Sequence, residues 1–382
     1  MKNIITESFN TILTLFCYFG LYRSENHTKM RKIWSLVLYF LGVTLIVLTS
    51  SKLFVKQSEE FTQTNHMIIF VADATALCIK MLPFLFNQGG IKKCIDYFDD
   101  QYFVPKNDEE ATITEECVRV CKRNFRAFAF VAILADVWWN IAPIFDNEYN
   151  LPLDIWLPYD PKSGPVTFYV TYIFTVTGMF YLGLIGSSLD PLTVGLVCHA
   201  TCQIKILKYN LGKEKMENQS IYSLINHEDV IKTLKECIAH HNKILGFVVE
   251  YENCFTWCMF SQMAAITIGL GFCCIGITMV SFTDSYGLIF VACYLILCSQ
   301  LLFYCHYGML LYNENEGLLN AIFTSSWYHY DIRTRKMLLI ITERSKIPIV
   351  LSAGRVIKLN YETFISTLKT TYSLIALLKN FK

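Results

Sequence analysis

Four charged residues interrupt stretches that are otherwise apolar: Asp73, Lys80, Asp136 and Asp190. Asp73 and Lys80 are seven positions apart, which places them near one face of a helix. A charged side chain that faces lipid costs about 3 kcal/mol on insertion scales. We therefore expect these four to face a bundle interior or an aqueous cleft. Structural pairing between helices is the favoured role, and a place on a ligand or ion path is the alternative.

Motifs for catalysis are absent from the sequence. It has no GxSxG, no HExxH and no phosphate loop, and no group of residues assigns an acid, a base and a nucleophile. Cys198-His199 with Cys202 resembles metal-ligand spacing only loosely, and its helical periodicity predicts no metal site. The net charge of +1 gives no case for nucleic-acid binding. The sequence thus predicts neither an enzyme nor a cofactor.

The last stretch, Tyr361 to Phe381, is long enough for a membrane helix yet carries several hydroxyls and Lys369. Asn360 precedes it and is a good N-cap. A mixed stripe of this kind could line a pore, or it could pack inside a bundle with hydroxyls joining the helices. The stripe at helical spacing consists of Phe364, Leu368, Thr371, Ile375 and Leu378.

Composition then defines the elements that position these residues. The chain has 382 residues, 53% of them hydrophobic and 17% charged, which is too apolar for an ordinary soluble protein. Hydropathy predicts an all-α membrane protein with seven transmembrane helices. The segments are approximately 33–53, 67–87, 127–145, 166–188 with a helical continuation toward 207, 256–281, 285–311 and 361–381.

Lysine and arginine alternate between rich and poor loops. The N-terminal segment and the loops after the second, fourth and sixth helices hold most of them, whereas the other loops hold only Lys52, Lys56 and Lys162. The positive-inside rule predicts a cytoplasmic N-terminus and an extracellular C-terminus. G-protein-coupled receptors have the opposite orientation. The sequons at Asn26 and Asn218 then fall inside the cell, so we expect neither to be glycosylated.

The same orientation organises the rest of the chain. Residues 1–32 form a cytoplasmic segment without a cleavable signal pattern, residues 33–330 form helices one to six, and residues 331–382 form a cytoplasmic helix and helix seven. The fifteen cysteines avoid the outer loops and are expected as reduced thiols. The amphipathic stretches 208–250 and 331–345 suit either a subunit interface or simple cytoplasmic caps.

Aromatic residues concentrate in the outer halves of the helices. Together they could line a cavity for a small apolar ligand, or they could form an ordinary interfacial belt. The outer loop 145–165 contains four prolines and is either a rigid connector or a lid. The candidate ligand-binding residues are Asp73, Leu77, Trp138, Trp139, Tyr169, Tyr172, Met179, Phe272, Tyr286 and Phe290.

The chain resembles the insect odorant receptors, specifically their divergent tuning subunits. The resemblance is strongest over the C-terminal third, and earlier matches are LPLDIWLPYD in the outer loop and Leu189-Asp190 with His199. Gustatory receptors are the nearest rivals, but Leu378 and Lys379 stand where their final helix has Gln-Phe. The C-terminal matches are Tyr307-Gly308, Ala321, Ser325-Ser326-Trp327, Arg335-Lys336, Pro348, Leu351, Ala353-Gly354, Phe364, Lys369, Thr371-Tyr372-Ser373-Leu374 and Leu377-Leu378-Lys379.

The resemblance implies the ligand-binding subunit of an odorant-gated, non-selective cation channel. Four subunits, including the shared co-receptor, would surround a pore lined by the last helix, in the plasma membrane of an olfactory neuron. It implies a small volatile ligand in the outer half of the subunit, Thr371 on the pore helix and Ile375 at the gate. Leu378 falls at the selectivity glutamine, and Lys379 at a second apolar gate position.

Other classes of membrane protein are compatible with the same sequence features. A gustatory-type channel or a seven-helix receptor coupled to G proteins would also use a membrane bundle, and an anchor protein without a ligand is a third possibility. Because four lysines at one pore mouth would repel cations over roughly 8 Å, Lys379 argues against conduction by a homotetramer.

Overall fold

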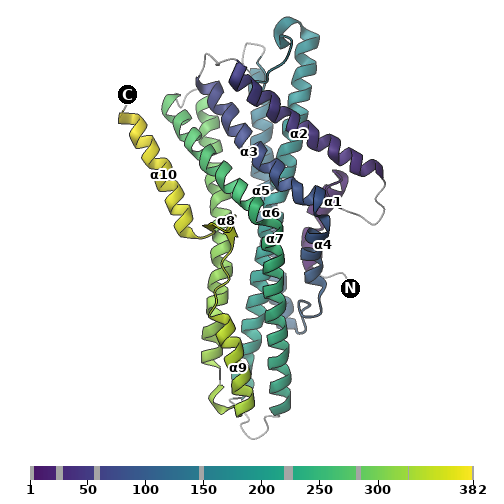
Figure 1. The fold of residues 1–382 in the computed structure, drawn as a ribbon, viewed down its shortest axis with the longest axis vertical. Helices are drawn as coiled ribbons and strands as arrows, with labels where there is room; N and C mark the ends of the chain where they lie inside the picture. Colours follow the sequence, from purple (N-terminus) through teal and green to yellow (C-terminus); the bar gives the residue numbers. More distant parts are fainter. Residues whose placement is uncertain are drawn as a thin grey trace.

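The computed structural model describes residues 4–22, 29–55, 61–145, 150–218, 227–280, 285–325 and 327–380. In these residues the chain forms an elongated helical bundle with one small hairpin (Figure 1). Its long helices are α2 (Lys29–Val55), α3 (Phe61–Phe86), α5 (Asp108–Ile141), α6 (Pro165–Asn218), α7 (His227–Met279), α8 (Ser285–Thr324) and α10 (Tyr361–Asn380). Its shorter helices are α1 (Ile4–Tyr18), α4 (Gln88–Asp96) and α9 (Ile332–Ser345), with single 3₁₀ turns at Tyr97–Asp99, Ala142–Phe145, Pro161–Ser163 and Trp327–His329.

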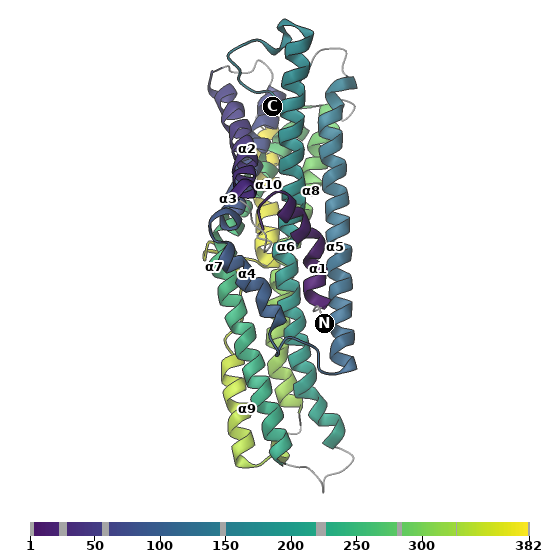
Figure 2. The same cartoon turned by 90° about the vertical axis from the view of Figure 1, so that its right-hand side faces the viewer.

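The helices α6, α7 and α8 run along most of the bundle, as the two perpendicular views show (Figure 2). The predicted amphipathic stretch after residue 227 and the fifth predicted span form one continuous helix, α7. Likewise α5 begins at Asp108, well before the apolar segment predicted from 127. A charged first turn favours this early start, because Asp108, Glu109 and Glu110 complement the helix dipole.

Five of the described helices are long and apolar enough to cross a membrane: the spans Lys32–Val55, Thr64–Phe86, Pro165–Gly212, Val230–Met279 and Gly287–Thr324. The remaining two predicted spans correspond to α5 and α10. Both are less apolar, α5 because its first half is charged and α10 because it carries hydroxyls and Lys369.

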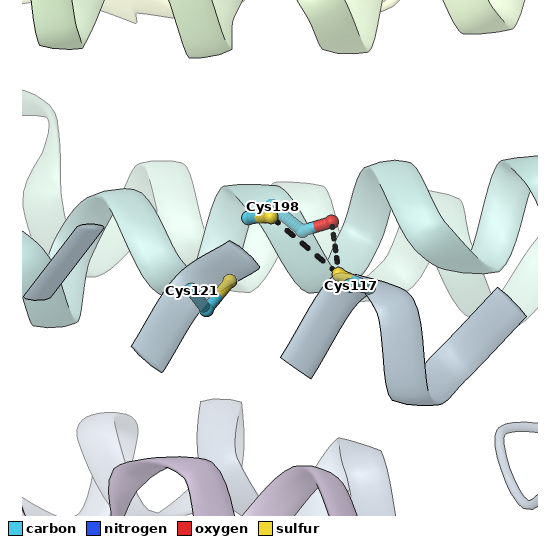
Figure 3. Close-up of side chains that lie close together, drawn as sticks. All are labelled: Cys117, Cys121 and Cys198. Carbon is cyan, nitrogen blue, oxygen red and sulfur yellow. Dashed lines mark hydrogen bonds between the residues drawn. The ribbon is translucent and has the colours of Figure 1, made fainter. Parts of the chain in front are cut away.

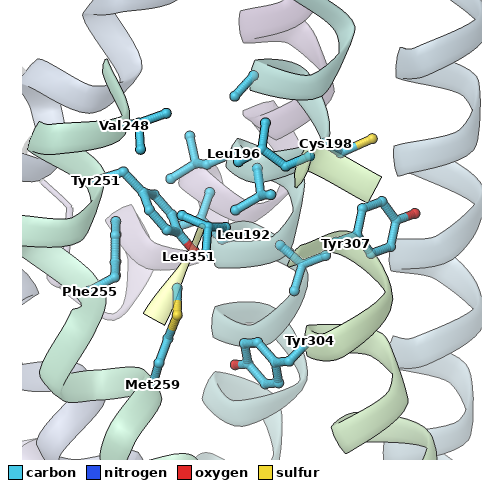
Figure 4. Close-up of a cluster of buried hydrophobic side chains, with 14 of the residues drawn as sticks. Leu192, Leu196, Cys198, Val248, Tyr251, Phe255, Met259, Tyr304, Tyr307 and Leu351 are labelled. Carbon is cyan, nitrogen blue, oxygen red and sulfur yellow. The ribbon is translucent and has the colours of Figure 1, made fainter. Parts of the chain in front are cut away.

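The main core extends from α1 to α9, and part of it lies where α6, α7 and α8 meet (Figure 4). Tyr251 and Phe255 of α7 are fully buried there against Leu192 and Leu196 of α6. The Tyr251 hydroxyl donates to the Thr193 carbonyl at 3.1 Å, so its polar end is satisfied inside an apolar cluster.

The N-terminal helix α1 packs on the bundle. The sequence predicts an amphipathic stretch over Phe9–Phe19, and the structure buries Phe9 and Phe16 of α1. A Cβ on Gly195 of α6 would meet the Phe9 ring at 2.9 Å, so glycine permits this close approach. Helix α1 is therefore part of the folded core.

A hairpin of β1 (Ser352–Ala353) and β2 (Ile357–Lys358) positions the start of α10. Gly354 takes the left-handed conformation with φ of 63°, and its N–H donates to the Thr256 carbonyl of α7 at 2.8 Å. The Leu359 carbonyl crosses α8 at Gly308, where a Cβ would lie 2.3 Å away. The predicted N-cap is present, since Asn360 Oδ1 accepts from the Thr363 N–H at 2.9 Å.

Candidate functional site: a cavity between five helices

A cavity of about 210 Å³ lies between α3, α5, α6, α7 and α8. Most of its wall is apolar, with a few polar groups, as is usual for a small-molecule site. Helix α3 contributes Ile69, Phe70, Asp73, Ala74, Leu77 and Lys80, and α5 contributes Phe128, Ala132, Ala135, Asp136 and Trp139. Helix α6 contributes Met179, Leu182, Gly183, Gly186, Ser187 and Asp190, α7 contributes Gln262, and α8 contributes Cys293, Ile296, Leu297 and Gln300.

Two glycines of α6 shape the cavity wall. A Cβ on Gly183 would meet the Asp136 carboxyl carbon at 2.9 Å, so glycine allows α5 to approach here. A Cβ on Gly186 would meet only Leu77, at 3.7 Å, which is ordinary contact. Gly183 is therefore needed for helix packing, whereas Gly186 leaves open space in the cavity.

The floor of the cavity is a buried polar network. Lys80 of α3 forms an ion pair with Asp190 of α6, and the two side chains are 5% and 2% exposed. Gln300 Nε2 also donates to Asp190, and the Tyr304 hydroxyl donates to the same carboxylate at 2.6 Å. The Lys80 ammonium lies 6.0 Å from the centre of the Tyr304 ring. One carboxylate thus joins three helices inside the bundle.

Two further carboxylates face the cavity. Asp73 lies among the helices, but its side chain is exposed because it opens into the cavity, and Gln262 Nε2 donates to it at 3.3 Å. Asp136 accepts from Asn140 Nδ2 at 3.3 Å. Each carboxylate has more acceptor positions than this one contact uses, so both can accept a hydrogen bond from a ligand.

Aromatic rings and the outer loop cover the outer end. The His66 ring of α3 meets the rings of Trp139 and Phe290, with centroids 5.2 and 4.6 Å apart. Trp139 Nε1 donates to the Pro152 carbonyl of the outer loop at 3.2 Å. Leu153 and Ile155 of that loop are buried against α2 and α6. The proline-rich loop is thus packed onto the bundle above the cavity.

The structure brings together some of the predicted ligand residues. Asp73, Leu77, Trp139 and Met179 line the cavity. The others do not line it. Trp138 and Tyr169 are exposed, 49% and 58%, on the outside of the subunit. Tyr172 donates its hydroxyl to the Asn140 carbonyl, while Phe272 and Phe290 pack in the core. The side chain of Tyr286 lies outside the described part.

Sequence reasoning missed the floor as a site. It expected Asp73 and Lys80 near one helix face, and both line the cavity from α3. It did not name their partners, which are Asp190 for Lys80 and Gln262 for Asp73. Sequence separation hides such pairs, because the partners are about a hundred residues apart or more. The glycines of α6 are the feature of the sequence that could have indicated the cavity, because small residues in an apolar helix often mark close packing or open space.

The last helix, α10, packs against α7 and α8. Its Phe364 and Leu368 contact the core, and Thr371 is buried on the same side. Lys369 and Tyr372 of the same helix are exposed. The side chains of Ile375, Leu378 and Lys379 lie outside the described part, so the predicted gate is placed only by its helix.

Comparison with known proteins agrees with this architecture. A family model described as 7tm Odorant receptor matches residues 60–372. Odorant receptor Or1 of Anopheles gambiae is 24% identical and aligns over 96% of this chain and 94% of its own length. Odorant receptor 33a of Drosophila melanogaster is 22% identical over 73% of this chain and 72% of its own length.

A solved structure has the same fold. The insect olfactory receptor OR5 from Machilis hrabei superposes with a TM-score of 0.84 at 15% identity, covering 97% of this chain and 96% of that one. Its complex with eugenol gives a TM-score of 0.83 over 98% and 97%. At this identity the likeness establishes the fold.

The fold defines a multi-pass helical membrane protein with an internal cavity. Its seven membrane helices are α2, α3, α5, α6, α7, α8 and α10. More particularly, the chain belongs to the odorant receptor family, a family of receptors and not of enzymes, which confirms the resemblance seen in its C-terminal third.

Proposed function

We propose that this chain is the ligand-binding subunit of an odorant-gated, non-selective cation channel. It assembles into a tetramer with the shared co-receptor, in the plasma membrane of an olfactory neuron dendrite. The observation that carries the proposal is that α8 borders the cavity on one face and contacts α10, the expected pore helix, on another.

The cavity favours a small, mostly apolar odorant that carries a hydrogen-bond donor. Its apolar wall binds the body of the ligand, while Asp73 and Asp136 offer acceptors in that wall. An alcohol, a phenol or an amine can use such an acceptor, whereas a hydrocarbon leaves it unpaired. A ligand that displaces water from these carboxylates without replacing its hydrogen bond leaves them buried and unpaired, which costs about 1–3 kcal/mol, so we expect donor-bearing odorants to be preferred.

The coupling route passes through α8. Cys293 faces the cavity, and the next residue, Tyr294, interacts through its hydroxyl with Thr371 of α10. A ligand that requires a shifted α8 would therefore displace α10 at Thr371. The ligand biases the gate only by its difference in affinity between the closed and open states.

The gate itself is proposed from the family resemblance. Ile375 forms the apolar constriction, Leu378 stands at the selectivity position and Lys379 at the mouth. Four copies of Lys379 would repel cations, so the proposal requires co-receptor subunits for conduction. Ile375→Ala should raise basal or evoked current in cells that express both subunits. An unchanged channel would remove Ile375 from the gate.

Adjacent tryptophans give a matched test of the cavity. Trp139 lines it, whereas Trp138 is exposed on the outside. We expect Trp139→Ala to change the ranking of odorants in a current assay, and Trp138→Ala to preserve that ranking at equal surface expression. The proposal fails if Trp138→Ala alters the ranking and Trp139→Ala does not. Current that persists in excised patches without nucleotide separates a channel from a G-protein-coupled receptor.

A further inference from the structure

Four cysteines form two pairs with the same spacing on neighbouring helices. Cys117 and Cys121 lie one turn apart on α5, and Cys198 and Cys202 lie one turn apart on α6. The sulfurs of Cys117, Cys121 and Cys198 all lie within 4.8 Å of one another, and those of Cys117 and Cys198 are 3.5 Å apart (Figure 3). The Cys198–Cys202 spacing alone predicts no metal site, but the fold adds two thiols from α5.

This geometry is close to that of a bound soft metal ion. Zn–S bonds of about 2.3 Å in a tetrahedral site place sulfurs roughly 3.8 Å apart. The observed separations bracket that value, so small side-chain rotations would complete the site. Thiolates select Zn²⁺, Cd²⁺ and Cu⁺ over hard cations. Because the cluster lies in the half of the bundle assigned to the cytoplasm, its thiols are kept reduced.

Two thiols of the cluster are accessible to an ion. Cys117 and Cys121 are only half-buried, so an ion from the cytoplasm can reach them. Because thiolates are the metal-binding form, binding would release thiol protons to solvent.

A histidine beside the cluster is held in the tautomer of a ligand. His199 Nδ1 lies 3.7 Å from the Cys117 sulfur, and its Nε2 lies 2.9 Å from the Ser8 hydroxyl of α1. Ser8 donates its only hydroxyl proton to the Ile5 carbonyl, at 2.6 Å. Ser8 must therefore accept from His199 Nε2–H, which leaves the Nδ1 lone pair facing the sulfurs. Such a second partner orients metal-binding histidines.

We propose that Cys117, Cys121, Cys198 and His199 form a binding site for a soft d¹⁰ metal ion, of which Zn²⁺ is the cytoplasmic example. The ion would connect α5 to α6 and, through His199 and Ser8, to α1. It would fix the inner half of the bundle, while the odorant cavity occupies the outer half. The site is independent of the proposed channel function, since binding can be measured on the isolated receptor.

The test uses the full-length receptor in detergent with a phosphine reductant, titrated with Cd²⁺ and then with Zn²⁺. We expect thiolate-to-Cd²⁺ charge-transfer absorption that saturates at one ion per chain and is displaced by Zn²⁺. Cys117→Ser and Cys198→Ser should weaken binding at least tenfold, and His199→Gln should weaken it while keeping thiolate absorption. Cys274→Ser, a buried thiol near the outer end of α7, is the matched control and should bind as the parent does.

Zn²⁺ should also raise the thermal unfolding temperature of the parent and of Cys274→Ser, but not of Cys198→Ser. Elution as a single folded species would show that each variant is intact before titration. The proposal is overturned if no saturable one-to-one binding occurs, or if Cys117→Ser and Cys198→Ser bind as tightly as the control. A Cys117–Cys198 disulfide found by mass spectrometry under the same reductant would also overturn it.

Discussion

The buried ion pair at the cavity floor gives a quantitative prediction through a double-mutant cycle. Asp190 accepts from Lys80, Gln300 and Tyr304, and both charged side chains are at most 5% exposed. Asp190→Asn leaves the Lys80 ammonium buried without its counter-ion. Removing one member of a buried pair costs about 3–5 kcal/mol.

The double variant Lys80→Met/Asp190→Asn should recover most of that loss. Met fills the space of the lysine stem, and the amide oxygen introduced in place of the Asp190 carboxylate can still accept from Tyr304. We expect each single variant to lose about 3–5 kcal/mol and the double variant about 1–2 kcal/mol, which is a coupling of at least ~4 kcal/mol.

Thermal unfolding followed by size-exclusion chromatography measures this cycle in the purified receptor, and surface expression provides a second readout. The single variants should unfold at clearly lower temperature than the double variant. If the double variant is as unstable as the sum of the singles, then the two groups do not stabilise each other. If Asp190→Asn unfolds at the same temperature as the parent, then Lys80 is not confined beside Asp190, and the two do not form the polar floor of the cavity.

Three further predictions follow from single features of the bundle. Gly186→Val should fill part of the cavity and weaken responses to the largest odorants about tenfold or more, as measured by dose–response curves. Gly183→Ala should instead lower surface expression, as measured by surface labelling, because its Cβ meets the Asp136 carboxyl. His240 and His241 lie on the cytoplasmic part of α7, before the span predicted from residue 256. Burial lowers the pKa of His240 and His241 to about 4, so both are neutral in the folded protein. The free energy of unfolding has its full value above pH 6.5 and should fall as the pH drops toward 4, by roughly 1–2 kcal/mol per histidine at pH 5. An unchanged unfolding temperature between pH 7.5 and pH 5 would contradict this. Asn360→Ala removes the α10 cap and should cost about 1 kcal/mol, visible as faster amide exchange in the first turn of that helix and not in α9.

The membrane class and the helical segments could be read from the chain alone. Long apolar runs and the distribution of lysine and arginine are local properties, so they survive without any knowledge of packing. The N-cap at Asn360 and the amphipathic helix over 331–345 are local in the same sense, and both are present. Only the helix ends were misplaced, as at α5, where polar residues continue the helix beyond the membrane.

The tertiary structure decided which side chains meet. Lys80 and Asp190, Cys117 and Cys198, and Ser8 and His199 are each 81 to 191 residues apart along the chain. Helical periodicity gives the face of each residue but not the partner that the face will contact. Trp138 and Trp139 show the limit: they are neighbours of the same type, yet one is exposed and the other lines the cavity.

The sequence by itself therefore determined a seven-helix membrane protein of a recognisable family, because hydropathy, charge asymmetry and family residues are written along one chain. Packing between helices decided the cavity, its polar floor and the thiol cluster, because those sites exist only where rotation, tilt and close approach at glycines bring separate helices into contact.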